Sequence, residues 1–136
     1  MAQRPKPTGI EPAPINPPLK WAGGKRWLVP HVRQMWTPHG TSRLVEPFCG
    51  GLAVALGLTP HRALLNDLNP HVINFYRHLR RGLTVRLEME NDAAAFYAHR
   101  LRFNDLVAAG RARTVETASL FYYLNRTGYN GLCRFN

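Results

Sequence analysis

Apolar positions along the first half of the chain alternate between helical spacing and short continuous runs. Residues 25–36 carry apolar side chains at helical spacing up to a break at Pro38 and Gly40, which predicts a helix. Residues 43–47 form a short apolar run that ends at a glycine turn, as a buried strand would, and residues 52–58 predict a short helix. Residues 62–67 form a second apolar run that ends in polar residues. The apolar positions of the first helix are Trp27, Leu28, Val32, Met35 and Trp36.

The second half of the chain predicts helices. Asn69 and Pro70 begin one that ends near Gly82, because asparagine caps helix N-termini and proline fits the first turn. Residues 84–109 predict a mostly helical stretch, and residues 115–125 predict a further helix before a turn-rich loop. The core candidates of the stretch 84–109 are Phe96, Tyr97, Leu101 and Leu106. The apolar positions that predict the helix 115–125 are Val115, Ala118, Leu120, Phe121, Tyr122 and Leu124. Strand, glycine turn, helix, strand, helix is the opening of an α/β nucleotide-binding sheet.

The N-terminal segment differs from the rest of the chain in its high proline content. Residues 1–18 hold six prolines, which fix φ and lack an N–H, so we expect a proline-rich flexible arm before a folded part over residues 19–136. A length of 136 residues fits one domain, and an apolar content of 45% excludes a disordered chain. No apolar run approaches the roughly 20 residues that span a bilayer. With two cysteines and no apolar leader, we expect a reducing, cytoplasmic location and no membrane.

Positive charge dominates the chain, with 18 Lys and Arg against 8 Asp and Glu and a formal net charge of +10. The excess is spread over both halves, and it favours a polyanionic partner, nucleic acid before membrane. Arginine contributes most of the basic residues, and its planar fork suits bidentate phosphate contacts. A compositional bias toward arginine explains the same count, so charge alone leaves both interpretations open.

Two features point to a nucleotide-like ligand. The segment 46–51 ends in Gly50 and Gly51, which let a ligand approach the backbone before a helix N-terminus. Asp67 ends the second predicted strand, where an acid accepts hydrogen bonds from ribose hydroxyls in doubly wound sheets. The alternative for Asp67 is a turn residue ahead of Asn69. Together, the glycine turn and the acid favour a cofactor site more than either does alone.

Two further segments combine glycine with aromatic and basic residues. In the segment 19–25, Trp21 can stack on an aromatic ligand and Lys25 can pair with a carboxylate. Composition alone favours the alternative, a core tryptophan beside a flexible turn. The segment 124–136 interleaves arginine, asparagine and aromatic residues on a glycine-rich loop, as a DNA-contacting loop or a capped helix end would. The six histidines show no metal-ligand spacing, and neither cysteine has a histidine neighbour, so we expect no metal and no cysteine nucleophile.

These four segments, in this order, resemble the N-terminal half of the DNA adenine-N6 methyltransferase family that includes the Dam methylases, the D12 class. The resemblance rests on residues 20–25, 46–51, 66–69 and 125–136. It implies an α/β fold, a partial Rossmann-like S-adenosylmethionine-dependent methyltransferase fold with additional helices, and methyl transfer to adenine in double-stranded DNA. The residues it assigns to cofactor binding are Trp21, Lys25, Phe48, Gly50 and Asp67. Those it assigns to DNA binding are Lys20, Arg126, Tyr129, Asn130 and Arg134.

The sequence departs from this family at two points. Leu52 stands where relatives carry another small residue. The Asp-Pro-Pro-Tyr-type motif that holds the flipped adenine is absent from the 136 residues, so we expect no catalytic residue in this chain. The chain is then a truncated enzyme or one half of a split enzyme with a complementing chain. The alternatives are a non-catalytic module that binds DNA, S-adenosylmethionine or both, and an inert remnant.

Overall fold

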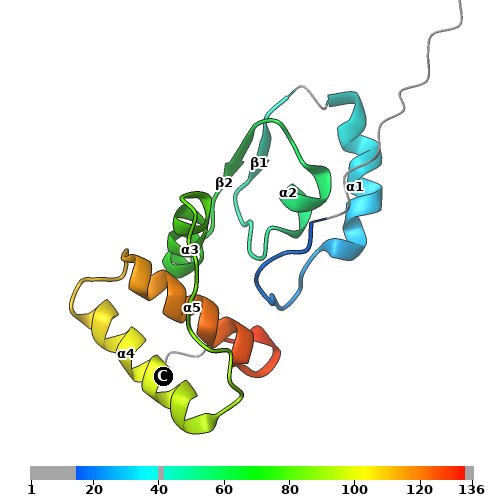
Figure 1. Ribbon diagram of the computed structural model, residues 1–136. Helices are drawn as coiled ribbons and strands as arrows, with labels where there is room; N and C mark the ends of the chain where they lie inside the picture. The colour runs from blue at the N-terminus through cyan, green and yellow to red at the C-terminus, as the bar shows by residue number, and fades with distance from the viewer. Residues whose placement is uncertain (1–14, 40–41, 134–136) are drawn as a thin grey trace, which may run out of the picture.

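The computed structural model describes residues 15–39 and 42–133. Arg134 and residues 1–14 of the expected arm lie outside the described residues. The elements appear in the expected order of helix, strand, helix, strand and helices (Figure 1). They are η1 (Arg26–Leu28), α1 (Val29–Trp36), η2 (Thr37–His39), β1 (Leu44–Glu46), α2 (Ala53–Leu58), β2 (Ala63–Leu65), α3 (Pro70–Arg80), α4 (Ala93–Ala108), α5 (Val115–Thr127) and η3 (Tyr129–Gly131).

A small parallel sheet forms the upper part of the molecule in Figure 1. β1 pairs with β2 in parallel, with Val45 opposite Leu64, and α2 makes the crossover between them. α1 packs against α2. Gly57 permits this close approach, because an added Cβ would lie 2.6 Å from a γ-carbon of Val29. The arrangement is a strand–helix–strand unit consistent with an α/β methyltransferase-like fold.

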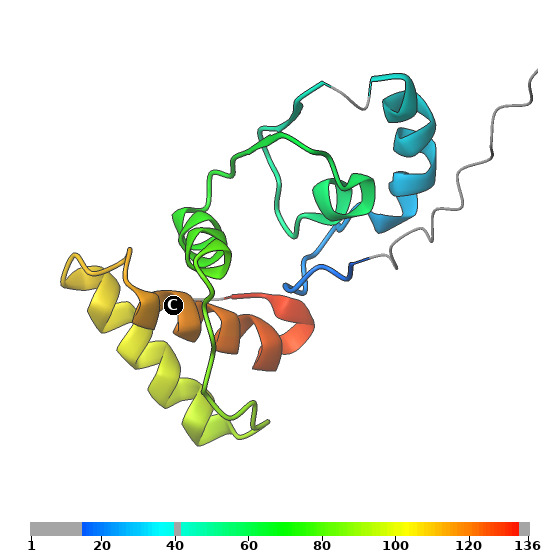
Figure 2. The same cartoon turned by 45° about the horizontal axis from the view of Figure 1, so that its top comes forward.

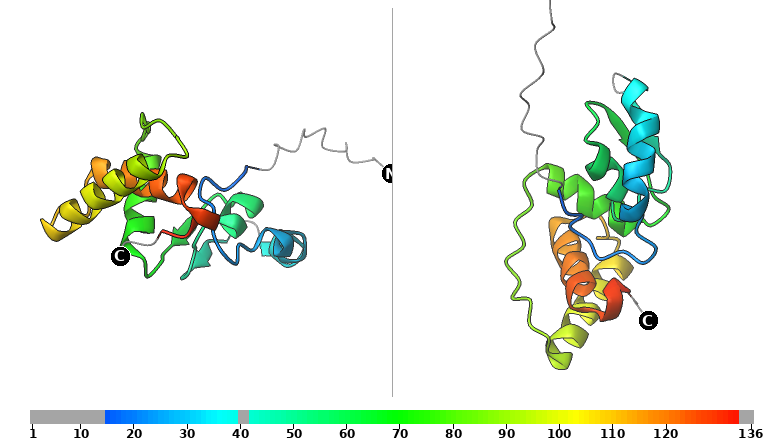
Figure 3. Two further views of the ribbon diagram at one scale, coloured as in Figure 1. Left: turned by 90° about the horizontal axis from the view of Figure 1, so that it is seen from below. Right: turned by 90° about the vertical axis from the view of Figure 1, so that its right-hand side faces the viewer.

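Three helices form the lower part of the molecule, with α5 packed against both α3 and α4 (Figures 1 and 3). Each begins at a polar cap: the side chains of Asn69, Asp92 and Thr114 accept a hydrogen bond from a backbone N–H in the first turn. The larger core lies between these helices, and Leu19 from the start of the chain is buried in it. The members of this core are Leu19, Val72, Phe75, Phe103, Leu106, Leu120, Phe121, Tyr123 and Leu124.

α3 connects the helical part to the sheet. Tyr76 packs against the larger core and also against a smaller core of Cys49, Leu52 and Ala55. Its hydroxyl donates a hydrogen bond of 3.0 Å to the carbonyl oxygen of Gly50. The hydrogen bond of Tyr76 therefore ties the glycine turn after β1 to α3, which the larger core holds in place.

Several local expectations are wrong. Residues 84–92 are not helical, and Leu87 packs against the larger core from an irregular segment. In α4, Phe103 and Leu106 form the buried face, so Tyr97 and Leu101 lie on another face and are 58% and 64% exposed.

The strands and α1 are also less buried than the pattern predicts. Val45 and Leu64, opposite one another on the sheet, are 49% and 52% exposed. In α1 and the preceding turn, Trp27 and Met35 are exposed. No helix among the described residues is long and apolar enough to cross a membrane.

Candidate functional site

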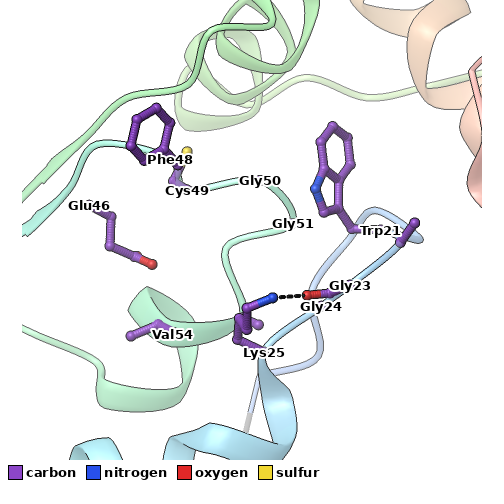
Figure 4. Close-up of a pocket in the computed structure, with 12 residues that line it drawn as sticks. Trp21, Gly23, Gly24, Lys25, Glu46, Phe48, Cys49, Gly50, Gly51 and Val54 are labelled. Carbon is purple, nitrogen blue, oxygen red and sulfur yellow. Dashed lines mark hydrogen bonds between the residues drawn. The ribbon is translucent and has the colours of Figure 1, made fainter.

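A cavity of about 290 Å³ opens where the turn after β1 meets the turn before η1 (Figure 4). Trp21, Lys25, Phe48 and Gly50, four of the five residues assigned to the cofactor, line this cavity. Two segments that lie far apart in the sequence thus form one hollow, as the family resemblance implies. Its full lining is Trp21, Ala22, Gly23, Gly24, Lys25, Glu46, Phe48, Cys49, Gly50, Gly51, Ala53 and Val54.

The Trp21 indole lies directly against the glycine turn. A Cβ added to Gly50 would lie 2.6 Å from Trp21 Nε1, and one added to Gly51 would lie 2.9 Å from Trp21 Cβ. Gly50 also has a φ of +46°, which side-chain-bearing residues rarely adopt. Only glycine leaves room here for the indole, so these two residues build one wall of the cavity. Phe48 lies on the other side of the turn and is 76% exposed (Figure 4).

Lys25 holds the N-terminal turn together. Its Nζ donates a hydrogen bond of 2.7 Å to the carbonyl oxygen of Gly23 (Figure 4). Gly23 has a φ of +72°, and the Gly24 N–H donates to Trp21 O at 3.1 Å. The ammonium keeps two further donors, so it can bond a ligand carboxylate while it holds the turn.

Glu46 is the residue that the sequence reasoning missed. It ends β1 and directs its carboxylate into the cavity between Phe48 and Lys25 (Figure 4). Burial raises the pKa of Glu46, and the hydrogen bond from the backbone of Ala55 offsets this in part. Its Oε2 atom is buried and lacks a hydrogen-bond partner. The position at a strand end beside a glycine turn was the signal that could have identified it.

A buried acceptor without a partner costs free energy until a donor reaches it. The ammonium group of a methionine moiety is such a donor, and its charge complements the carboxylate. The Gly50 and Trp21 wall leaves room for the ligand, and the exposed Phe48 ring offers a face for stacking. The residues present therefore fit S-adenosylmethionine.

Asp67 lies behind the glycine turn and not on the cavity wall. Its Oδ2 accepts a hydrogen bond from Gly50 N at 2.8 Å, and its Oδ1 accepts one from Asn69 N at 2.9 Å. The second bond makes Asp67 a turn residue ahead of Asn69, which is the alternative that the sequence analysis left open. The first fixes the position of Gly50, so the carboxylate supports the cavity from outside it.

Two further ionisable groups, Cys49 and Tyr76, lie near the turn, and neither is ionised at neutral pH. Burial, with the nearby charges of Asp67 and Glu46, raises the pKa of the Cys49 thiol to about 11. Burial also raises the pKa of Tyr76. Both stay protonated at neutral pH, and a protonated thiol is a poor nucleophile. Among the described residues, no group of three or more His, Cys, Asp or Glu side chains is placed to hold a metal ion.

Leu52, the departure from the family pattern, adopts a φ of +62° at the start of α2 and is buried. A left-handed conformation costs a side-chain-bearing residue about 1–2 kcal/mol. Burial of the leucine against Cys49 and Ala55 offsets this strain. The backbone of Leu52 keeps a left-handed conformation that glycine adopts without strain.

The residues assigned to DNA gather at the C-terminal end of α5. Lys20 Nζ donates to the carbonyl oxygen of Arg126 at 2.9 Å, which brings the start of the chain beside this end, as the blue and red segments show in Figure 2. Tyr129 is 83% exposed, and Asn130 is exposed with a φ of +49°. Lys20, Arg126, Tyr129 and Asn130 therefore lie on neighbouring segments, whereas Arg134 lies outside the described residues.

A second cavity, of about 240 Å³, lies beside these residues. Lys20, Arg26 and Arg126 line it and give it a basic rim. It shares Trp21 with the first cavity, together with Gly24, Gly51 and Ala53. Trp21 thus lies between the candidate cofactor cavity and the basic surface.

Comparison with known proteins identifies the family to which the chain belongs. Residues 21–136 match the family model described as "D12 class N6 adenine-specific DNA methyltransferase". The chain is 35% identical to a DNA adenine methylase of Haemophilus influenzae, over 98% of this chain and 48% of that protein. It is 33% identical to the type II methyltransferase M1.LlaDCHI of Lactococcus lactis subsp. cremoris, over 90% of this chain and 44% of that protein. It is 40% identical to a DNA adenine methylase of Salmonella typhi, over 87% of this chain and 43% of that protein. The chain therefore spans less than half the length of these relatives.

Proposed function

From the premise that this chain belongs to the D12 class of N6 adenine-specific DNA methyltransferases, we propose that it is the cofactor-binding half of such an enzyme. In this proposal the cavity of Trp21, Glu46, Phe48 and Gly50 binds S-adenosylmethionine, and the end of α5 contacts double-stranded DNA. The observation that carries the proposal is the buried Oε2 atom of Glu46, which has no hydrogen-bond partner and belongs to a residue lining the cavity walled by Trp21 and Gly50. We propose in addition that β1 and β2 belong to a larger, Rossmann-like sheet in the complete enzyme.

Each residue has a defined part in cofactor binding. Glu46 accepts from the ammonium group, Lys25 pairs with the carboxylate of the same moiety, and Phe48 stacks on the adenine. Asp67 fixes the Gly50 backbone from outside the cavity. On the family resemblance, we assign its remaining lone pairs to the ribose hydroxyls of a cofactor that reaches past this turn. When bound, S-adenosylmethionine supplies an electrophilic methyl group. The chain holds the cofactor in one orientation, and such positioning of a reactant raises the reaction rate.

The DNA-contacting part rests on charge and exposure. Lys20 and Arg126 carry positive charge at one end of α5, beside the exposed ring of Tyr129 and the amide of Asn130. Arginine and lysine neutralise phosphates, while aromatic and amide side chains contact bases. We assign Arg134 to the same interface on the family resemblance.

We propose further that a complementing segment carries the catalytic motif that holds the adenine. This follows from the 43–48% of the relatives' length that the chain matches and from the absence of an Asp-Pro-Pro-Tyr-type motif in its 136 residues. The exposed apolar positions Val45 and Leu64 are where additional secondary structure would cover the sheet. A non-catalytic module that binds S-adenosylmethionine and DNA is the alternative.

Calorimetry with S-adenosylmethionine tests the cofactor assignment. Asp67→Ala removes the acceptor of the Gly50 N–H and is expected to weaken binding at least about tenfold. Asp92→Ala is the matched control, because its carboxylate also accepts from a backbone N–H, that of Ala95, at the start of α4. Equal binding by wild type and Asp67→Ala would contradict the assignment of Asp67, and no binding by wild type would contradict the cofactor site itself.

The DNA assignment is tested by the salt dependence of duplex binding. Arg126→Ala is expected to lower the slope of log affinity against log salt by about one unit, the contribution of one phosphate contact. Arg113→Ala is the control, because Arg113 lies at the other end of α5, roughly 20 Å away along a helix of 13 residues. Transfer of labelled methyl groups to DNA by this chain alone would refute the need for a complementing segment.

A further inference from the structure

Asn125 is a fully buried amide near the C-terminal end of α5, at 0% exposure. It stands where the predicted helix 115–125 meets the glycine-rich segment, and in the structure the helix continues past it to Thr127. Its side-chain amide forms hydrogen bonds with two other segments of the chain, as donor to both and as acceptor from one. We call residues 20–25 the cofactor loop and residues 128–131 the DNA loop.

The contacts of Asn125 connect these two loops. The Lys20 N–H donates to Asn125 Oδ1 at 2.9 Å, and Asn125 Nδ2 donates to Lys20 O at 2.7 Å. The same Nδ2 donates to Gly131 O at 3.1 Å. One side chain therefore fixes the backbone immediately before Trp21 and the backbone immediately after Asn130.

The two loops also touch one another directly. An added Cβ on Gly131 would lie 2.5 Å from both Lys20 Cβ and Lys20 O, and Gly131 has a φ of +71°. Lys20 thus packs against the backbone of Gly131 with no space for a side chain between them. Since Trp21 follows Lys20 and packs on Gly50, the contact continues to the wall of the cofactor cavity.

We propose that Asn125 is a positioning residue that couples cofactor binding to DNA binding. The proposal rests on the proposed function of the two loops. A ligand that orders one loop holds Asn125 in its bonded arrangement, and the other loop is then already ordered for the second ligand. Ordering that one ligand supplies lowers the entropy cost of binding the next, which gives positive cooperativity.

The experiment measures the affinity of the 136-residue chain for a fluorescent DNA duplex, with and without saturating S-adenosylhomocysteine. In wild type, S-adenosylhomocysteine is expected to tighten duplex binding about fivefold or more, the lower range of allosteric coupling. Asn125→Asp keeps the size of the side chain but loses both donated bonds, and it is expected to reduce this factor to less than about twofold. Asn74→Asp is its control, because Asn74 is also buried and donates to Thr114 O, away from both loops.

A second pair of variants leaves Asn125 intact. Gly131→Ala forces a Cβ against Lys20 and is also expected to abolish the coupling. Gly82→Ala is its control, because Gly82 has a φ of +87° but nothing within 4 Å of an added Cβ. This pair decides the question if Asn125→Asp lacks a cooperative thermal transition. Hydrogen exchange of residues 20–25 provides an independent readout, since duplex binding should slow it in wild type and Gly82→Ala but not in Gly131→Ala.

The outcomes separate this inference from the proposed function. Wild type that binds both ligands without coupling overturns the inference alone. Coupling retained in Asn125→Asp or Gly131→Ala overturns it as well, because a purely structural amide predicts lower stability with unchanged coupling. Wild type that binds neither ligand refutes the proposed function and the inference with it. Lost coupling in both variants and retained coupling in both controls support it.

Discussion

Gly50 is the position where one added methyl group tests the geometry of the cavity most directly. Gly50→Ala places a Cβ 2.6 Å from Nε1 and 2.9 Å from Cδ1 of Trp21. Neither atom can retreat without rotation of the indole, because the same side chain also lies against Gly51. The variant must therefore displace Trp21, the glycine turn or both.

The destabilisation has two parts. The φ of +46° is unfavourable for alanine and costs about 1–2 kcal/mol. Overpacking against a ring that is held in place costs about 1–3 kcal/mol more. The sum of about 2–5 kcal/mol is a large share of the 5–15 kcal/mol by which domains are stable. We expect a clear fall in the thermal midpoint and S-adenosylmethionine binding that is weaker by about tenfold or more.

Gly82→Ala separates the two parts, since its φ of +87° imposes strain without any contact within 4 Å. The excess destabilisation of Gly50→Ala over Gly82→Ala, measured by urea unfolding, reports the contact with Trp21. In a double-mutant cycle with Trp21→Ala, this excess should appear as a coupling energy of about 1–3 kcal/mol. Equal destabilisation of the two glycine variants, or cofactor binding unchanged in Gly50→Ala, would refute the packing of Trp21 on the turn.

Three further changes test the site and its support. Glu46→Gln should weaken S-adenosylmethionine binding about 10-fold or more through loss of a charge-assisted bond. It should also stabilise the free protein at neutral pH, because burial raises the pKa of Glu46. The wild type should therefore lose stability relative to the variant as pH rises above the ordinary pKa of 4.5. Unfolding free energies of the two proteins that change in parallel with pH would contradict this. Gly57→Ala should destabilise by about 1–3 kcal/mol through its clash with Val29, and Val29→Ala should restore part of that loss in thermal melts. Thr59→Gly should stabilise by about 1 kcal/mol, because Thr59 is exposed at a φ of +47°, whereas Thr37→Gly, at a φ of −51°, should destabilise.

The sequence predicts those elements whose signals are local. The N-cap at Asn69 and the proline after it place the start of α3 at the observed residue. The glycine turn after β1 is likewise visible as a pair of adjacent glycines. These features depend on neighbours within one helical turn or one reverse turn, so no tertiary information is needed.

What the sequence does not predict depends on which segments meet. Tyr97 and Leu101 fit the helical spacing, but α5 covers the face that bears Phe103 and Leu106 instead. The bonds of Asn125 are not predictable from the sequence, because its partner Lys20 lies 105 positions away. Glu46 reads as part of a strand end, and only the fold shows that one of its oxygens is buried without a partner.

Asp67 shows how one residue can satisfy two interpretations that the sequence sets against each other. As a turn residue it accepts from Asn69 N, and as a support of the cofactor cavity it accepts from Gly50 N, one bond to each oxygen. A carboxylate offers about four acceptor positions, so two remain free, and on the family resemblance we assign these to the hydroxyl groups of a ribose. The turn bond also fixes the orientation of the carboxylate before any ligand arrives, which reduces the entropy cost of binding. The structural role of Asp67 is therefore a condition for its proposed role in cofactor binding and not an alternative to it.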